Sequence, residues 1–390
     1  MAKGDLFGPE WHEVEDLTTG VKTLQLTDHK AHSHHLYFTN SGWYDDNRRL
    51  LFGSDRGGSS NLYSLDLQTG EYRQLTDLEE PPGSGSGAFQ STSVNPVRPE
   101  AYFWWQNTLV AIDLETLEER TLYTVPDGFH GGGQTNVTAD GAYVCVNIGQ
   151  DLSDRIPMDL GAGYVGMREY WAAKPRCQIV RVPTDGGEPS VVWEEDSWIG
   201  HVNTSPTRPN LLTFCHEGPW HLVDHRIWML DLDTGEVWKL RPTAPNERVG
   251  HEYWFADGEH VGYHGWTEGG SPFHGAVRYD NTTVGEYPLS HTSTHFHSND
   301  LNLIVGDGNR DRPFLLLWRL TEHGYEGPRV LLRHRGSFHI QAVHVHPRVS
   351  PDGRQILYTS DPRGYGNPYL VEIPDVETLP LLEEVEQPRS

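Results

Sequence analysis

The chain has 390 residues and a formal net charge of −25. This acidity excludes nucleic acids and anionic membranes as partners, because both are bound through basic surfaces. A small anionic substrate is not excluded, provided that a pocket supplies arginine, histidine or metal charge locally. The 41 glycines, 26 prolines, 13 tryptophans and 17 tyrosines favour many short strands joined by turns.

The three cysteines, Cys145, Cys177 and Cys215, are odd in number and widely spaced. This pattern predicts reduced, buried thiols rather than a disulfide framework. The first residues contain no apolar signal segment, and no stretch reaches membrane-spanning length. We therefore expect a cytoplasmic protein that binds no membrane and has no obligate protein partner.

An apolar strand carrying Asp, then a turn and a second strand, recurs in about seven copies at a spacing of roughly 40–50 residues, the period of four-stranded propeller blades. The copies are at 14–20, 65–70, 112–117, 182–186, 230–235, 279–285 and 320–324. The long interval after the third copy predicts an inserted excursion at 150–172.

A second element, an Asp-Gly turn or its substitute followed by an apolar run, repeats in step with the first. These turns are at 46–47, 95–96, 140–141, 205–206, 257–258, 299–300 and 352–353. The chain begins on an outer-strand motif at 14–27 and ends after inner strands at 355–373, so its first segment can complete the last blade. We predict an all-β, seven-bladed β-propeller forming a single domain over 1–390, with the ring closed by the N-terminal strand joining the last blade and with tails at 1–12 and 380–390.

The innermost strands of a propeller surround a central channel, so residues at their starts converge on one face. Six positions before three of the turns stand Gln134, His251 and His346, and four positions before two others stand His201 and His295. Most of the 22 histidines are expected to be ordinary surface or core residues. Equal offsets indicate equivalent places in a repeat, so we predict one polar ring at the channel mouth.

The stretch 338–359 contains Gln341, His344 and His346 ahead of a Ser-Pro-Asp-Gly turn and a strand-like run. His344 and His346 are spaced to face one side of a strand, as metal ligation requires. Gln341 has the opposite parity and joins them only if the chain bends or bulges at 342–343. Imidazole and amide ligands suit Mn²⁺, Fe²⁺, Co²⁺ or Zn²⁺ better than Ca²⁺.

A dense polar stretch at 213–228 holds His216, Glu217, Asp224 and Arg226. It is interpreted either as a site wall or as a salt-bridged turn between strands, and the sequence alone favours the turn. Arg226 has the fixed guanidinium that holds a carboxylate at two points. The sequence contains no nucleophile elbow, phosphate loop or His-Glu-x-x-His motif.

Five segments of the second half are specific in combination: 214–219, 222–228, 250–258, 295–299 with 305–308, and 341–347. They resemble segments of the oligogalacturonate lyases, polysaccharide lyase family 22. The first half is similar more loosely, through the blade pattern and 174–177. The resemblance implies a seven-bladed propeller and a bound Mn²⁺, with other divalent transition metals as alternatives. The implied ligands are His295, Gln341, His344 and His346.

The resemblance also implies β-elimination in short, pectin-derived uronate oligosaccharides. His251 would abstract the C5 proton, and Arg226 and the metal would offset the charge on the substrate carboxylate. The products would be 4,5-unsaturated or derived keto-uronates. His34, His201 and His216 are expected to bind substrate together with Arg226.

The sequence departs from the family pattern at a few places. The family has His-Asp-Leu-Val-Asp-Ala-Arg after Gly-Pro, whereas this chain has Trp220, His221 and His225 at the variable positions, and it has His35 where a basic residue follows the histidine matching His34. Two other functions remain as alternatives. One is a metal-dependent propeller hydrolase or lactonase, and the other is a noncatalytic TolB-like propeller.

Overall fold

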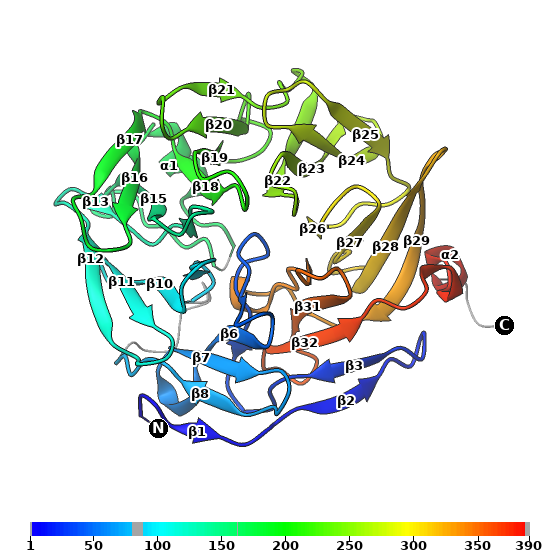
Figure 1. Cartoon of the computed structure of the whole chain (residues 1–390). Coiled ribbons are helices and arrows are strands. Elements are labelled where there is room, and N and C mark those ends of the chain that lie inside the picture. The colour runs from blue at the N-terminus through cyan, green and yellow to red at the C-terminus, as the bar shows by residue number, and fades with distance from the viewer. Residues whose placement is uncertain (1, 80–88, 162, 387–390) are drawn as a thin grey trace.

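Seven antiparallel sheets form a ring around a central axis (Figure 1). The computed structural model describes residues 2–79, 89–161 and 163–386. This architecture confirms the predicted all-β, seven-bladed propeller.

The first three sheets contain the strands of residues 6–7 and 33–195. The first, in the order β1-β8-β7-β6-β4 with β5 paired to β6, consists of β1 Leu6–Phe7, β4 Ser33–His34, β5 Trp43–Tyr44, β6 Arg49–Ser54, β7 Asn61–Asp66 and β8 Tyr72–Gln74. The second consists of β9 Ser93–Val94, β10 Glu100–Trp105, β11 Thr108–Asp113 and β12 Glu119–Thr124. The third consists of β13 Phe129–His130, β14 Thr135–Val137, β15 Tyr143–Gln150, β16 Cys177–Pro183 and β17 Ser190–Glu195.

The next three sheets follow the chain without interruption. The fourth consists of β18 Ile199–Thr204, β19 Leu211–His216, β20 Ile227–Asp231 and β21 Val237–Lys239. The fifth consists of β22 Glu247–Trp254, β23 His260–Thr267, β24 Pro272–Arg278 and β25 Val284–Pro288. The sixth consists of β26 Phe296–His297, β27 Leu303–Gly306, β28 Phe314–Thr321 and β29 Gly324–Arg333.

The seventh sheet combines strands from both ends of the chain. It consists of β2 His12–Glu15, β3 Lys22–Gln25, β30 Arg348–Val349, β31 Gln355–Ser360 and β32 Asn367–Glu372. β3 pairs with β32 over the register Thr23 opposite Val371 to Gln25 opposite Tyr369. The N-terminal segment therefore provides the two outer strands of the last blade.

Few helices accompany the strands. They are α1 Met167–Ala172, α2 Leu382–Glu386 and the 3₁₀ turns η1 Arg56–Gly58, η2 Gln341–Val343 and η3 Val376–Thr378. None of the helices in the described part of the chain has the length and apolar character needed to cross a membrane.

The recurring Asp-x-x-Thr-Gly motif forms the turn between the two outer strands of a blade. In the first blade the Asp66 carboxylate accepts hydrogen bonds from the backbone N–H groups of Gln68 and Thr69. Gly70 then adopts a φ of 76°, the left-handed region that glycine occupies without a Cβ clash. Asp231 and Gly235 repeat this arrangement in the fourth blade. The repeat seen in the sequence is thus a turn with a defined hydrogen-bond pattern.

The hydrophobic core lies between neighbouring blades. For example, Leu51 and Leu62 of the first sheet pack with Phe103 and Ile112 of the second. The three cysteines are free and buried, as predicted. Each blade therefore buries its faces against the next one, which holds the ring together through nearest-neighbour contacts.

The two predicted tails are packed against the ring where they are described. β1 pairs with the outer strand β8, and Glu10 accepts hydrogen bonds from Arg56 and Tyr72. Near the C-terminus, α2 buries Leu382 completely in the cluster around Trp318. The prediction of tails at 1–12 and 380–390 is wrong for β1, Glu10 and α2, which pack against the ring. Pairing a strand edge and burying an apolar side chain both stabilise such contacts. The segment between β15 and β16 covers most of the predicted excursion at 150–172. It connects two paired strands of the third sheet and contains α1.

Acid should destabilise this fold in a way set by buried histidines. Burial lowers the pKa of His274 to about 3 and those of His225 and His334 to about 4. In the unfolded chain a histidine binds its proton near pH 6.5, so stability is complete above that pH and falls as the pH drops toward 4, by up to about 1.4 kcal/mol per pH unit and group. Urea titrations at pH 7, 6, 5 and 4.5 measure this slope. His274→Gln should make it shallower, whereas the exposed control His323→Gln should not; equal slopes in all three proteins would contradict the assignment.

Candidate functional site

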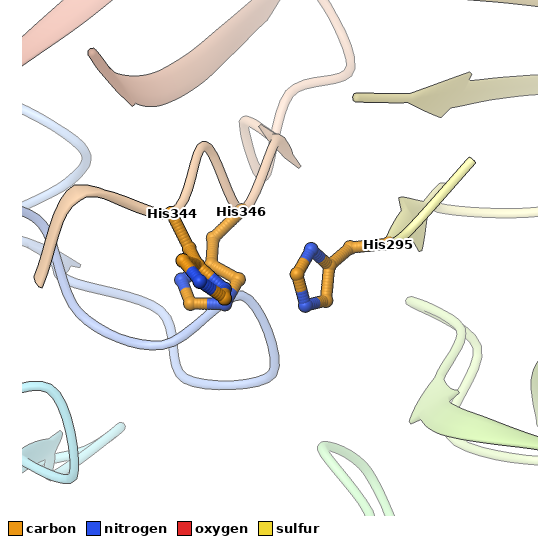
Figure 2. A group of neighbouring side chains, drawn as sticks. All are labelled: His295, His344 and His346. Carbon is orange, nitrogen blue, oxygen red and sulfur yellow. The ribbon is translucent and has the colours of Figure 1, made fainter. Parts of the chain in front are cut away.

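Three histidines from two blades meet at the channel mouth. The ligand atoms of His295, His344 and His346 all lie within 4.8 Å of one another, and all three side chains are buried. Figure 2 shows the imidazoles of His344 and His346 side by side, with His295 facing them from the opposite side. The ring centre of His295 is 4.3 Å from that of His346 and 5.8 Å from that of His344. This cluster has the size of a metal site.

The segment that carries two of these histidines is not a strand. Residues 344–347 are irregular and precede β30, so the predicted strand placement of His344 and His346 is wrong. His346 has a φ of 44°, and the left-handed backbone turns its side chain. The 3₁₀ turn η2 bends the chain at Ala342 and Val343, which is the bend that the parity of Gln341 required.

The buried carboxylate of Asp307 fixes the orientation of His295. The Nδ1 atom of His295 donates to Oδ2 of Asp307 at 2.7 Å, and the His295 backbone N–H donates to Oδ1. This bond leaves Nε2 of His295 with its lone pair, as in metal sites where a carboxylate orients a ligating histidine. Sequence reasoning assigned no role to Asp307, although the Val-Gly-Asp-Gly segment at 305–308 contains it.

Several buried polar atoms of the segment 341–346 have no hydrogen-bond partner among the described residues. They are Oε1 of Gln341, Nδ1 of His344 and both ring nitrogens of His346. A buried polar atom without a partner is costly, and a divalent transition metal would bind one nitrogen of each histidine and an amide oxygen. Burial lowers the pKa of His344 to about 4, which keeps its imidazole neutral at pH 7. The residues present therefore fit a metal centre.

His251 lies next to the cluster on a bulge of β22. The register of β22 against β23 shifts between Gly250 and Tyr253, and His251 has a φ of 50°. Its ring centre is 4.9 Å from that of His295. Nδ1 donates to the carbonyl of Thr294 at 2.8 Å, so the neutral ring carries its free lone pair on Nε2. Burial holds the pKa of His251 well below its ordinary value, and the ring is a neutral proton acceptor at pH 7.

Arg226 is buried and held by two carboxylates. Its Nη1 and Nη2 atoms donate to the two oxygens of Glu217 at 2.9 and 3.2 Å, and Nε is 3.6 Å from Glu252. Burial opposes ionisation of Glu217, but the Arg226 charge outweighs it and lowers the pKa of this carboxyl to about 2. The salt-bridged interpretation of 213–228 therefore describes Arg226. Its side chain nevertheless packs against Gly250, the residue before His251, because Gly250 has no side chain to fill that space.

His201 occupies the equivalent bulge in the neighbouring blade. Its φ is 47°, and its ring is parallel to that of His251 with the centres 6.4 Å apart. The two ring nitrogens lie 3.5 Å from Glu217 and 3.9 Å from Glu252. The structure thus brings His201, His251 and the metal cluster together, as the polar-ring prediction expected. Gln134 accepts a hydrogen bond from Thr39, in the loop that follows β4.

The structure does not bring His34 or His216 to this cluster. His34 is 3% exposed and its Nδ1 donates to the carbonyl of His35, inside the first blade. His216 bonds to Glu195 and packs its ring on Phe214 and Trp228. The neighbour of His34 lies closer to the cluster: Nε2 of His35 donates to the carbonyl of His346 and so supports the segment that carries His344 and His346.

Two aromatic residues at the centre of the site were missed by sequence reasoning. A loop of the first blade reaches into the middle of the ring (Figure 1). It carries Phe38, whose ring contacts His251, His295 and His346, and Tyr37, whose ring contacts His201 and His346 edge-on. Only their position after the His34-His35 pair signals this role in the sequence.

The fold and the site define a seven-bladed propeller protein with a candidate metal centre and an adjacent neutral histidine, His251. A family model described as oligogalacturonate lyase matches residues 1–377. The chain belongs to the oligogalacturonate lyase family.

Named relatives cover nearly the whole chain. It is 30% identical to the oligogalacturonide lyase of Pectobacterium atrosepticum and 30% identical to the oligogalacturonate lyase of Dickeya dadantii, with 96% of this chain and 99% of each relative covered. A solved structure of an oligogalacturonate lyase in complex with manganese is similar at 30% identity and a TM-score of 0.85, covering 96% of this chain and 99% of that one.

Removing one ligand or its orienting carboxylate should weaken metal binding to different degrees. His344→Ala should abolish tight binding of Mn²⁺, and Asp307→Asn should weaken it about 10- to 100-fold, because the carboxylate acts through His295. Calorimetric titration of chelator-treated protein with Mn²⁺ gives both affinities. The control is His260→Ala, which removes an exposed histidine that also bonds to an aspartate, Asp257. Unchanged affinity in His344→Ala would remove His344 from the ligand set.

Proposed function

We propose that this chain is a metal-dependent lyase that cleaves short galacturonate oligosaccharides by β-elimination. The observation that carries the proposal is the position of His251, a neutral histidine with its lone pair on Nε2 beside the three-histidine cluster. The family membership and the relatives' printed activities support the same substrate class.

Proton abstraction needs a base and a way to stabilise charge. The C5 hydrogen of a uronate is weakly acidic because it is α to a carboxylate, and its removal builds further negative charge on that group. His251 accepts this proton on Nε2 while the Thr294 carbonyl holds Nδ1 and fixes the ring. The bond to the C4 oxygen then breaks, and a 4,5-unsaturated uronate results.

His295, Gln341, His344 and His346 would hold the metal, which we propose to be Mn²⁺. The manganese complex of a relative supports this choice, as does the mixed imidazole and amide donor set. A bound divalent ion supplies positive charge that stabilises the carboxylate in the transition state. The chain would fix the position of the ion by orienting its ligands. Asp307 holds the His295 ring, and His35 holds the backbone carbonyl of His346.

Arg226 provides a second positive charge at the same place. Its guanidinium is fixed by Glu217, and its Cδ and Nε atoms lie against Gly250, the residue before His251. A prepositioned charge stabilises an anionic transition state without reorganisation. We include His201 among the substrate-binding residues because its ring is parallel to His251.

The proposed elimination needs no attacking water and no nucleophile, which agrees with the absence of such motifs from the sequence. A hydrolase or lactonase on the same metal would instead need a water molecule, activated by the ion, as its nucleophile. A cytoplasmic location and the lack of an obligate protein partner stay predictions.

The role of His251 can be tested by its removal. His251→Ala should lower kcat on di- and trigalacturonate by at least about 10²- to 10⁴-fold, the usual contribution of a general base, and should leave the Mn²⁺ affinity unchanged. The measurement is the near-ultraviolet absorbance of the conjugated double bond, with metal titration alongside. Retained turnover would exclude His251 as the base, and cleavage without that absorbance would favour the hydrolase.

A further inference from the structure

Two stacked tryptophans extend from the candidate base toward solvent. Trp220 lies edge-on to His251, with ring centres 5.1 Å apart, and stacks on Trp266, with centres 5.2 Å apart and planes inclined by 12°. The Arg226 guanidinium is 5.3 Å from the Trp220 ring centre. From the interior outward, the groups are thus the buried guanidinium of Arg226, the half-buried indole of Trp220 and the indole of Trp266, which is 38% exposed.

All of these groups lie on one face of the pair β22 and β23. His264 and Trp266 have the same parity on β23, and Trp220 contacts both rings. Gly250, opposite His264 in the register, leaves the space that Arg226 and Trp220 occupy. The arrangement therefore depends on Gly250, which has no side chain. It extends from His251 through Trp220 to the exposed Trp266.

Arg248 stands directly opposite Trp266 in the β22–β23 register. Side chains of opposed residues in an antiparallel pair project from the same face with their Cβ atoms about 4.5–5.5 Å apart. Nη1 of Arg248 donates to the carbonyls of Pro245 and Glu247. Within residues 2–79, 89–161 and 163–386, Arg248 forms no ion pair with a carboxylate.

The nearest carboxylate in sequence does not neutralise Arg248. Glu247 accepts two hydrogen bonds from Arg241, at 2.5 and 3.1 Å, and a third from the backbone of Ala244. The Arg248 guanidinium thus keeps N–H groups for an external anion, in a chain whose net charge is −25. An exposed aromatic face beside an unpaired guanidinium matches a uronate, which has an apolar ring face and a carboxylate.

We propose that Trp266 and Arg248 form a binding subsite for the galacturonate residue next to the one that reacts at His251. Trp266 stacks on the sugar ring, Arg248 binds its carboxylate, and Trp220 supports Trp266 from behind. The proposal rests on the proposed function for the identity of the sugar. It assigns to the β22–β23 face a part of substrate recognition that the metal cluster and Arg226 do not supply.

Binding to a protein that does not turn over substrate tests the subsite directly. In a His251→Ala background loaded with Mn²⁺, the Kd for trigalacturonate is measured by calorimetry for Trp266→Ala and for Arg248→Gln. Each substitution should raise the Kd about tenfold, the effect of losing one aromatic stack or one charge-assisted contact. Arg248→Gln should also make the Kd less dependent on salt concentration.

Matched controls come from the same chain. Tyr365→Ala removes another exposed aromatic residue, and Arg354→Gln another exposed arginine, and neither should change the Kd more than about twofold. A Kd for Trp266→Ala and Arg248→Gln within the range of these controls would overturn the subsite.

The two proposals fail in different ways. Wild-type protein is incubated with trigalacturonate in parallel, and the unsaturated product is followed. Absence of that product together with weakened binding in the variants would reject the lyase reaction and keep the subsite. Normal product formation with unchanged Kd values would reject the subsite alone.

Discussion

The functional site depends on one geometric constraint, which is that the innermost strands of all blades begin around one axis. His251, His295 and His346 are separated by some 40 to 50 residues in the chain, a repeat-length interval, yet their neighbouring ring centres are 4.9 and 4.3 Å apart. The blades make this convergence rigid because each packs its core against the next. His201, His251 and His346 also have positive φ values, a backbone conformation that costs energy and is concentrated at functional sites.

Charge at the site is arranged against the background of a strongly acidic protein. Arg226 is buried with Glu217 and Glu252, and His201 lies between the same two carboxylates. Such a cluster holds the guanidinium in one place, at the cost of offsetting part of its charge. The three-histidine cluster has a different composition, because imidazoles are its main polar groups and Asp307 is the carboxylate that orients His295. The surroundings of His251 thus include both a fixed arginine, packed against Gly250, and the three-histidine cluster.

Much of this architecture was predictable because related turns recur in step along the chain. The Asp-x-x-Thr-Gly turns with their variants and the Asp-Gly turns with their substitutes indicate the seven blades, and the similar offsets of Gln134, His201, His251, His295 and His346 indicate the polar ring. Details that depend on tertiary contact were not predictable. The role of Asp307 comes from a hydrogen bond between neighbouring strands and that of His35 from one between two sheets. Phe38 acts through a loop that crosses to the axis, and irregular backbone at 344–347 replaces the expected strand. The family resemblance and the dense polar stretch at 213–228 likewise placed His34 and His216 with the site, although His34 bonds to the carbonyl of His35 and His216 bonds to Glu195.

The seventh sheet, in which β3 pairs with β32, has a consequence for how the protein is made. While the nascent chain emerges from the ribosome, the hairpin of β2 and β3 cannot join the rest of its sheet until more than 300 further residues have been synthesised. His344 and His346 precede β30 of the same sheet, so the last ligands arrive together with the strands that complete that blade. A product that stops before His344 would therefore lack both the inner strands of that sheet and two of the three clustered histidines.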